Sequence, residues 1–257
     1  MEERDPLTKK LVVKEIKAKT ILSKSQVSDY ALNAYVGCQH RCTYCYARFM
    51  KRFTGHREQW GEFVDVKINA AELLKREVMK KKKGHVWISG VCDAYQYLEK
   101  RYMLTRRCLE ILVEHGWPVT IQTKSPLVLR DIMILKRAAD AEVGFTITTA
   151  DERIRDFFEP GAPPIKERIS ALEILHAEGI KTFVMVAPML PGTEGLVDML
   201  KGKVDHALID RYNYYYADWV YKKYGLEYAM KDDFFLKKGN ELGAAFERAG
   251  IPCLKVY

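Results

Sequence analysis

The chain lacks any apolar run of the length, about 20 residues, that a membrane-spanning helix needs. Its first residues, MEERDPLTKKLVVKE, are charged and have no apolar centre of the kind found in secretory signal peptides. We therefore expect a cytoplasmic protein with no membrane partner. Extended Pro, Ser or Gly tracts are also missing, so the sequence predicts neither a disordered region nor a flexible linker.

Cysteine is scarce, and the six cysteines are unevenly placed. Three of them fall within eight residues, as Cys38, Cys42 and Cys45. The other three are scattered along the chain: Cys92, Cys108 and Cys253. This layout favours a metal site in a reducing compartment over a disulfide framework.

Acidic residues are outnumbered by basic ones, which gives a formal net charge of +8. Such a charge attracts polyanions, and basic segments at residues 80–83, 100–101 and 106–107 could contact phosphates. Lysine-rich runs are also typical of solvated helix ends. Nucleic acid therefore stands as a partner at about even odds against a peptide or a small molecule.

Short β-branched apolar runs alternate with longer amphipathic segments, and the 48% hydrophobic content suits one sizeable core. Strands are predicted at residues 30–36, 85–91, 118–123, 142–149, 181–189 and 206–212. Helices are predicted between them at residues 70–82, 104–115, 127–139 and 165–178, with a closing helix at residues 232–249. This alternation predicts an α/β fold of about six βα units around a parallel sheet, with ligands at the carboxyl ends of the strands.

The clustered cysteines form the pattern CxxxCxxC, in which three thiolates can surround one metal centre. Soft thiolates favour zinc or iron-sulfur centres over hard cations. A structural zinc site normally takes a fourth protein ligand, but no second cysteine pair follows, and His40 is too close to Cys38 to complete such a site comfortably. Three thiolates on an iron-sulfur cluster would leave one iron open for chemistry.

This motif, with an aromatic residue, Tyr44, before its last cysteine, resembles the signature of radical S-adenosylmethionine (SAM) enzymes. The longer string NAYVGCQHRCTYCYARFM is similar to the branch that contains spore photoproduct lyase, and the resemblance extends over residues 33–218. It implies a partial (β/α)6 TIM-like barrel of the radical SAM type, with a [4Fe-4S] cluster on Cys38, Cys42 and Cys45.

The same resemblance implies the reaction. A one-electron donor of the flavodoxin or ferredoxin type would reduce the cluster, and SAM would be cleaved to methionine and a 5′-deoxyadenosyl radical. The expected activity is that of a radical SAM enzyme, lyase-like or oxidoreductase-like. The chain would divide into a basic N-terminal arm (residues 1–29) packing on the barrel, the radical SAM core (30–225), and a C-terminal helix and short strand that close the barrel (226–257).

The resemblance also implies which residues bind SAM. Lys124 matches a lysine of the lyase that contacts the SAM carboxylate, and Ser125 follows it at the end of a predicted strand. Thr146 and Thr148 share one strand face, and Thr148 lies nearer the loop, where its hydroxyl could reach the ribose or the carboxylate. An ordinary surface lysine in a strand-to-helix loop is the alternative for Lys124.

Four further residues are candidates for the cofactor pocket. Tyr44 matches an aromatic residue that lies against the adenine, and Ala187 matches a position whose backbone meets it. Ser89 and Gly90 occupy the place where other members use a glycine-rich motif to bind the methionine amine. The usual Gly-Gly-Glu is missing there, and structural roles stay open for Tyr44 and Ala187.

Cys92 is a candidate catalytic residue, because the lyase returns a hydrogen atom to its substrate from a cysteine after the second strand. The match is not residue for residue, since Gly90 takes the donor's place when Asp93 is aligned. Cys92 is therefore a hydrogen donor, a radical relay or a small buried residue. Polar residues on the same loop could read a substrate or form a capping turn: Asp93, Tyr95, Gln96 and Glu99.

An aromatic group follows the last strand and could stack a base or pack the open side of the barrel: Tyr212, Tyr214, Tyr215 and Tyr216. The leading hypothesis is radical chemistry on a macromolecule, with nucleic acid ahead of protein. Radical modification of a peptide or small metabolite is one alternative. A non-catalytic metal-cluster module that binds nucleic acid is another, and the missing fourth thiolate counts against it.

Overall fold

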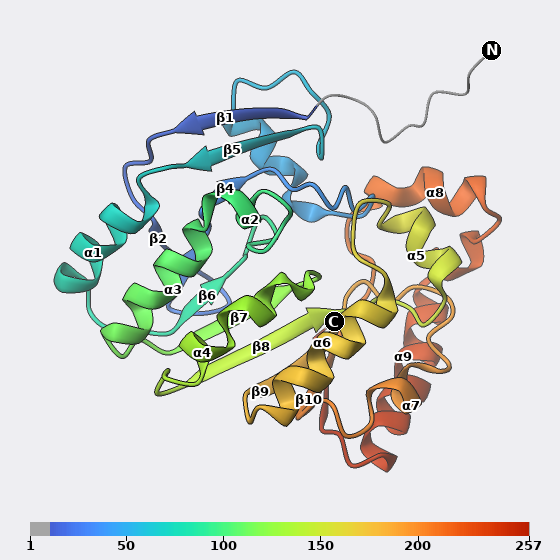
Figure 1. Cartoon of the computed structure of the whole chain (residues 1–257). Coiled ribbons are helices and arrows are strands. Elements are labelled where there is room, and N and C mark those ends of the chain that lie inside the picture. The colour runs from blue at the N-terminus through green and yellow to red at the C-terminus, as the bar shows by residue number, and fades with distance from the viewer. Residues whose placement is uncertain (1–10, 257) are drawn as a thin grey trace.

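A computed structural model describes residues 11–256 of the chain (Figure 1). The first ten residues of the predicted N-terminal arm lie outside the described residues. No helix of the described part combines the length and the apolarity needed to span a bilayer.

The main sheet has eight strands in the order β11-β10-β9-β8-β7-β6-β3-β2. Six parallel strands follow one another in chain order: β3 (Tyr30–Leu32), β6 (Val86–Ile88), β7 (Val119–Thr123), β8 (Ala141–Thr146), β9 (Lys181–Val186) and β10 (His206–Ile209). The edges are β2 (Leu22–Lys24), antiparallel to β3, and β11 (Cys253–Lys255), parallel to β10. Within residues 11–256 nothing pairs β2 with β11, so the sheet is open, and its six βα units confirm the predicted α/β architecture.

Most predicted helices are present, and they cover one side of the sheet (Figure 1). The longer ones are α1 (Ala70–Lys80), α3 (Leu104–Glu114), α6 (Ile165–Ala177) and α9 (Asp232–Arg248). Shorter segments are η2 (Tyr46–Phe53), α2 (Glu99–Tyr102), α5 (Glu152–Phe158), α7 (Leu196–Leu200), η4 (Tyr215–Ala217), α8 (Asp218–Lys223) and η5 (Glu227–Met230). Gly179, two residues after the end of α6, has a φ of 75°, a left-handed conformation that glycine adopts readily at the end of a helix.

The single helix predicted over residues 127–139 is wrong. This stretch forms a 3₁₀ turn, η3 (Pro126–Asp131), followed by the short helix α4 (Ile132–Leu135). Asp131 is fully buried and accepts hydrogen bonds from Arg106 and Arg130. Because this carboxylate must face its arginine partners, the backbone departs from the regular path of one long helix.

A second, smaller sheet contains β1 (Val12–Ile16), β5 (Phe63–Lys67) and β4 (Tyr35–Val36), in the order β1-β5-β4. The strand predicted over residues 30–36 is therefore two strands, β3 and β4, which join different sheets. Strands β1 and β2 hydrogen-bond to β5 and β3, so residues 11–29 are built into the two sheets. The boundaries of the three predicted parts stay a prediction.

The inside of the main sheet is closely packed around Phe183 of β9. Its ring stacks on His206 at a centroid distance of 5.2 Å and lies 6.3 Å from the Trp87 ring. On the neighbouring strand β8, a Cβ added to Gly144 would meet the Phe183 ring at 2.1 Å. Because Gly144 has no side chain, the Phe183 ring can occupy the space beside it.

We predict that Gly144→Ala lowers the free energy of unfolding by about 1–3 kcal/mol, because the added methyl forces the Phe183 ring out of its stack. Urea unfolding followed by circular dichroism measures the change. Gly55→Ala is the matched control, because a Cβ there has no neighbour within 4 Å, and it should change stability by no more than about 0.5 kcal/mol. Equal stabilities for the two variants would contradict the packing described.

Candidate active site

The three clustered cysteines lie on the loop that follows β4, at the carboxyl ends of the parallel strands. Cys38 and Cys42 are buried, Cys45 is partly buried, and all three are free thiols. Burial raises the pKa of Cys42 to about 12, and the charges of Glu159 and Cys45 add to this effect. Burial, Asp93 and the other two cysteines likewise raise the pKa of Cys38. The three thiols are thus near enough to interact electrostatically.

The donor set fits an iron-sulfur cluster. Trp60 Nε1 is a buried donor without a hydrogen-bond partner within residues 11–256, and the same N–H lies against Cys45. Burial raises the pKa of Cys45, whereas the Ala47 amide, Lys124 and Trp60 lower it. Across the described residues, no group of three or more His, Cys, Asp or Glu side chains is already placed to hold a metal ion. Cys38, Cys42 and Cys45 as its ligands stay a prediction.

His40, which lies inside the cysteine motif, pairs with Asp93 through one ring nitrogen. The His40 Nδ1 and Asp93 Oδ2 atoms are 3.3 Å apart, and both side chains are buried. Asp93 also accepts hydrogen bonds from the Thr123 hydroxyl at 2.7 Å and the Lys124 amide at 2.8 Å. Burial opposes ionisation of Asp93, but His40 and the hydrogen bonds outweigh it and hold its pKa at about 2. One carboxylate thus joins the cysteine loop to the end of β7.

The candidate residues that follow Asp93 are also buried and make contacts with the cysteine loop and with Asp131. Gln96 is fully buried; its amide donates to the Gly37 carbonyl and accepts from the Gln39 amide. Tyr95 and Glu99 are fully buried as well, and the Tyr95 hydroxyl donates to Asp131. The substrate-reading role considered for these side chains does not match this burial. Tyr95 N donates to Asp93 Oδ1, as expected for the capping-turn alternative.

A glycine in the loop after α5 allows that loop to pack closely against the cysteine loop. Gly161, after α5, donates its amide to the His40 carbonyl, and a Cβ there would meet the Gln39 carbonyl oxygen at 2.3 Å. The Thr43 amide donates to the Phe158 carbonyl at 2.8 Å. The cysteine loop is therefore held between the segments that follow β6 and β8.

Beside Cys42 lies a buried group of charges that the sequence pattern did not reveal. Glu159 and Arg168 are fully buried, with Arg168 Nη1 2.6 Å from Glu159 Oε2. Lys124 Nζ lies 4.0 Å from Glu159 Oε1 and 5.7 Å from the centre of the Tyr44 ring. Burial lowers the pKa of Lys124, but Cys42 and Glu159 outweigh it and raise it. The site thus holds a protonated lysine over the aromatic residue of the motif.

Three predicted cofactor contacts already have partners within the chain. The Thr148 hydroxyl donates to Glu159 Oε1 at 3.2 Å, and the Tyr44 hydroxyl donates to the same oxygen. Ser125 accepts from the Leu127 amide and caps η3. Thr148 and Ser125 therefore lie next to Lys124 as expected, but their hydroxyls serve the local structure.

The loop after β6 carries the remaining candidates. Ser89 has a φ of 92°, donates to the Cys92 carbonyl and accepts from the Ala94 amide, so its hydroxyl shapes the turn. A Cβ added to Gly90 would make ordinary contacts with Asn33 and Ala31 at 3.7–3.8 Å, and the Gly90 carbonyl accepts from the Tyr46 hydroxyl. Cys92 is partly buried, with its sulfur 3.7 Å from Asn33 Oδ1. Burial raises the pKa of Cys92 to about 12.

Ala187 directly follows β9 and forms a cis peptide bond with Pro188. It lies at the same end of the sheet as Lys124 and Cys92, because each of these residues follows a parallel strand. The structure thus places all the predicted residues at one end of the barrel. The sequence analysis did not identify Glu159, Arg168 and Asn33 as site residues. For Arg168, a usable signal was its charge on the apolar face of its helix.

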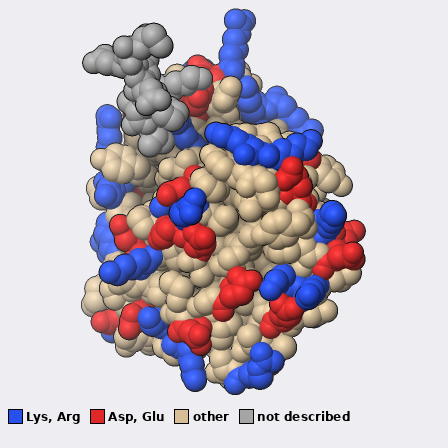
Figure 2. All heavy atoms as spheres, turned by 90° about the vertical axis from the view of Figure 1, so that its right-hand side faces the viewer, with Lys and Arg blue, Asp and Glu red and all other residues tan. Residues whose placement is uncertain are grey.

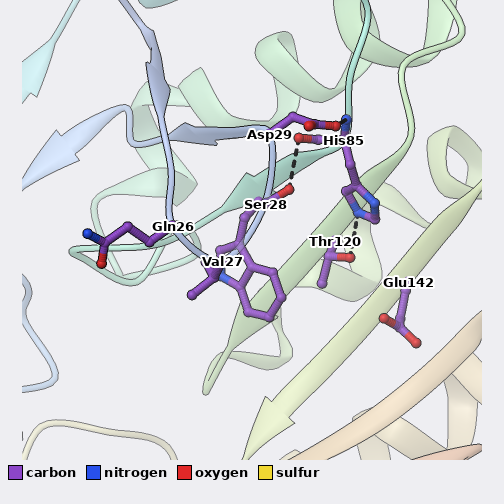
Figure 3. A pocket seen from close by; sticks show the side chains of 8 residues that line it. Gln26, Val27, Ser28, Asp29, His85, Thr120 and Glu142 are labelled. Carbon is purple, nitrogen blue, oxygen red and sulfur yellow. Dashed lines mark hydrogen bonds between the residues drawn. The ribbon is translucent and has the colours of Figure 1, made fainter.

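A separate hollow lies at the other end of the strands (Figure 3). Its volume is about 550 Å³, and His85, Thr120 and Glu142 line it near the beginnings of β6, β7 and β8. The His85 Nε2 and Thr120 Oγ1 atoms are 2.8 Å apart. This hollow is therefore separate from the predicted site.

Comparison with known proteins places the chain in a family. A family model described as the radical SAM superfamily matches residues 32–197. An uncharacterized protein of Methanocaldococcus jannaschii is 36% identical over 187 residues, which are 72% of this chain and 70% of that protein. A radical SAM Nalpha-GlyT isomerase of Pseudomonas phage M6 is 25% identical over 60% of this chain and 32% of that protein. Relatives from Acidianus two-tailed virus and Mycobacterium tuberculosis align over 58% and 50% of their own lengths.

Among solved structures, spore photoproduct lyase complexed with dinucleoside spore photoproduct has a similar fold. The TM-score is 0.71 at 13% sequence identity, and the match covers 95% of this chain and 82% of the lyase. This likeness confirms the predicted partial-barrel fold of the radical SAM type.

We predict that Asp93→Asn lowers the free energy of unfolding of the apoprotein by about 2 kcal/mol at neutral pH. Because the folded-state pKa lies below the unfolded value, the stabilisation is complete above about pH 4 and is lost as the pH falls through about 2. Urea unfolding at several pH values measures the difference from the wild type, which should narrow towards pH 2. Asp156→Asn, at an exposed position, is the control. A difference that does not change with pH would contradict the ion pair's role.

Proposed function

Because this chain belongs to the radical SAM superfamily, and is therefore an enzyme, we propose that it binds a [4Fe-4S] cluster and SAM and generates a 5′-deoxyadenosyl radical. Cys38, Cys42 and Cys45 would hold the cluster. When bound, the cluster supplies the electron that cleaves SAM into methionine and the radical. A protein of the flavodoxin or ferredoxin type would deliver that electron.

The observation that carries this proposal is the position of Lys124. This protonated lysine, whose side chain is 13% exposed, lies over the ring of Tyr44 in the cysteine motif, and its backbone amide donates to Asp93. A largely buried cation here suits the carboxylate of SAM, because a charge-assisted hydrogen bond strengthens where water is excluded. Glu159 Oε1 lies 4.0 Å from the ammonium and helps to hold it in place.

The other candidate residues surround Lys124. Tyr44 would lie against the adenine, with Thr148 and Ser125 behind Lys124. Gly90 and Ser89 would lie near the methionine amine, and Ala187 would offer backbone for the adenine. Since the Ser125, Thr148 and Ser89 hydroxyls bond within the chain, we propose that these residues shape the pocket and contribute few direct hydrogen bonds.

The proposed substrate is a nucleic acid. The net charge of +8 favours a polyanion, and the fold neighbour spore photoproduct lyase is described with a dinucleoside photoproduct. Cys92 is the candidate hydrogen donor, because its sulfur lies at the same end of the barrel and the Asn33 amide oxygen orients its S–H.

We predict that Cys38→Ala abolishes both iron binding and 5′-deoxyadenosine formation. Anaerobic reconstitution with iron and sulfide, reduction with SAM and chromatography measure both quantities. Cys253→Ala is the matched control, because Cys253 lies on the edge strand β11, and this variant should keep its iron and its product. A colourless zinc protein that leaves SAM intact would contradict the proposal.

We also predict that Lys124→Met raises the KM for SAM by about 10- to 100-fold, because a charge-assisted hydrogen bond contributes about 1.5–3 kcal/mol. Iron content should stay at the wild-type value, which separates cofactor binding from cluster binding. Lys136→Met, which removes an exposed lysine paired with Glu178, is the control. An unchanged KM for SAM in Lys124→Met would show that this lysine is structural.

A further inference from the structure

Five rings form a continuous row beside the cysteine loop, and we call it the aromatic ladder: Tyr46, Phe49, Phe53, Tyr214 and Tyr216. Tyr46 and Tyr214 stack with ring centroids 5.9 Å apart and planes inclined by 25°. Tyr214 and Tyr216 are nearly parallel at 6.2 Å, and Tyr46 stacks on Phe49 at 6.4 Å. Phe53 continues the row edge-on from Phe49.

The ladder joins the two sides of the open barrel. Tyr46 directly follows Cys45, and its hydroxyl donates to the Gly90 carbonyl on the loop after β6. Tyr214 lies in the segment after β10, the last of the six consecutive parallel strands. Since the main sheet does not close, these rings cross the open side of the barrel at the end where the cysteine loop lies.

The ladder is not core packing. Tyr46 is 44% exposed, Tyr214 50% and Phe53 69%. Tyr212, which could have belonged to the row, instead turns inward, where its hydroxyl donates to Asp218 and accepts from the Ala217 amide. Of the four tyrosines that follow β10, Tyr212 is used for packing, and the other three are at least partly exposed and can contact a ligand.

Positive charge accompanies the rings. The Arg48 guanidinium lies 5.5 Å from the centre of the Tyr216 ring, and that of Arg52 lies within 5.4 Å of the Phe49 and Phe53 rings. Residues 46–57 contain four Lys and Arg but no Asp or Glu. In the part of the chain that the structure describes, no carboxylate pairs with Arg48 or Arg52, and Arg48 Nε is buried without a hydrogen-bond partner.

One face of the molecule carries Lys and Arg side chains along its upper edge (Figure 2). On the side that contains α5, α8 and α9, Lys and Arg side chains gather along the upper part, above a broad area of uncharged residues (Figure 2). Stacked rings with interleaved arginines suit a ligand that repeats flat rings and negative charges along its length.

We propose that the aromatic ladder binds an unpaired stretch of a nucleic-acid strand, with bases stacked on Tyr46, Tyr214 and Tyr216 and phosphates on Arg48 and Arg52. A duplex hides the faces of its bases, so only an unpaired strand or an extruded nucleotide can stack here. The ladder then leads the strand to the cysteine loop. This inference rests on the proposed function for its nucleic-acid substrate and adds the strandedness of that substrate and its binding surface.

The test is fluorescence anisotropy of the anaerobically reconstituted protein with a labelled oligothymidylate of about 16 nucleotides, in the absence of SAM. The single strand should bind at least about tenfold more tightly than a duplex of equal length. Tyr214→Ala should weaken single-strand binding by about tenfold, which is within the range for one lost base stack. Tyr228→Ala, an exposed tyrosine in η5 outside the ladder, is the matched control and should bind like the wild type.

Arg48→Ala and Arg52→Ala should each reduce the slope of log affinity against log salt by about 0.7. Equal binding of duplex and single strand, an unchanged affinity in Tyr214→Ala, or full displacement by polyglutamate would overturn the inference. Because binding is measured without SAM, a protein that binds the strand but does not cleave SAM would refute the proposed function and leave the ladder supported. A protein that cleaves SAM but does not bind the strand would refute the role of the aromatic ladder and leave the proposed function supported.

Discussion

The Asp93 carboxylate connects three segments on which the rest of the site depends. It pairs with His40, inside the cysteine motif, and accepts from Thr123 and from the Lys124 amide at the end of β7. A buried carboxylate is costly unless every oxygen has partners, so these segments are held in one arrangement. The positions of the thiols and of the Lys124 ammonium are therefore linked through a single side chain.

Around this connection the chain divides its polar groups into two sets. One set, with Gln96, Gly161 and the Thr43 amide, fixes the backbone of the cysteine loop. The other set, with Glu159 and Arg168, fixes Lys124 and the Tyr44 ring without occupying the open side of the site. Burial strengthens both sets, because water cannot compete for their hydrogen bonds. The arrangement suits chemistry in which a reactive radical must meet only the intended substrate.

The sequence predicted well what depends on local pattern. The β-branched runs located all six parallel strands, and the CxxxCxxC spacing indicated the cysteine loop as the candidate site. The small sheet was missed because β1 and β5 pair across about fifty residues, and no local period reports such a partner. The predicted helix over residues 127–139 failed because the buried partners of Asp131 override helical periodicity.

The candidate site was predicted in position but less well in role. Lys124, Ser125 and Thr148 lie near strand ends as expected, and their roles stay a prediction, but a sequence cannot show that a hydroxyl is already bonded to Leu127 or Glu159. His40, judged sterically awkward as a metal ligand, proved to be the partner of Asp93. Glu159 and Arg168 escaped notice because neither belongs to a motif, although an arginine among the apolar residues of a helix is a readable signal.

Electron paramagnetic resonance of the reconstituted and reduced protein, recorded before and after addition of SAM, tests the central claim most directly. The account predicts the signal of a reduced [4Fe-4S] cluster whose g-values shift when SAM is added, because three cysteine ligands would leave one iron free to take SAM. A cluster signal that SAM leaves unchanged, or no iron signal at all, would contradict it.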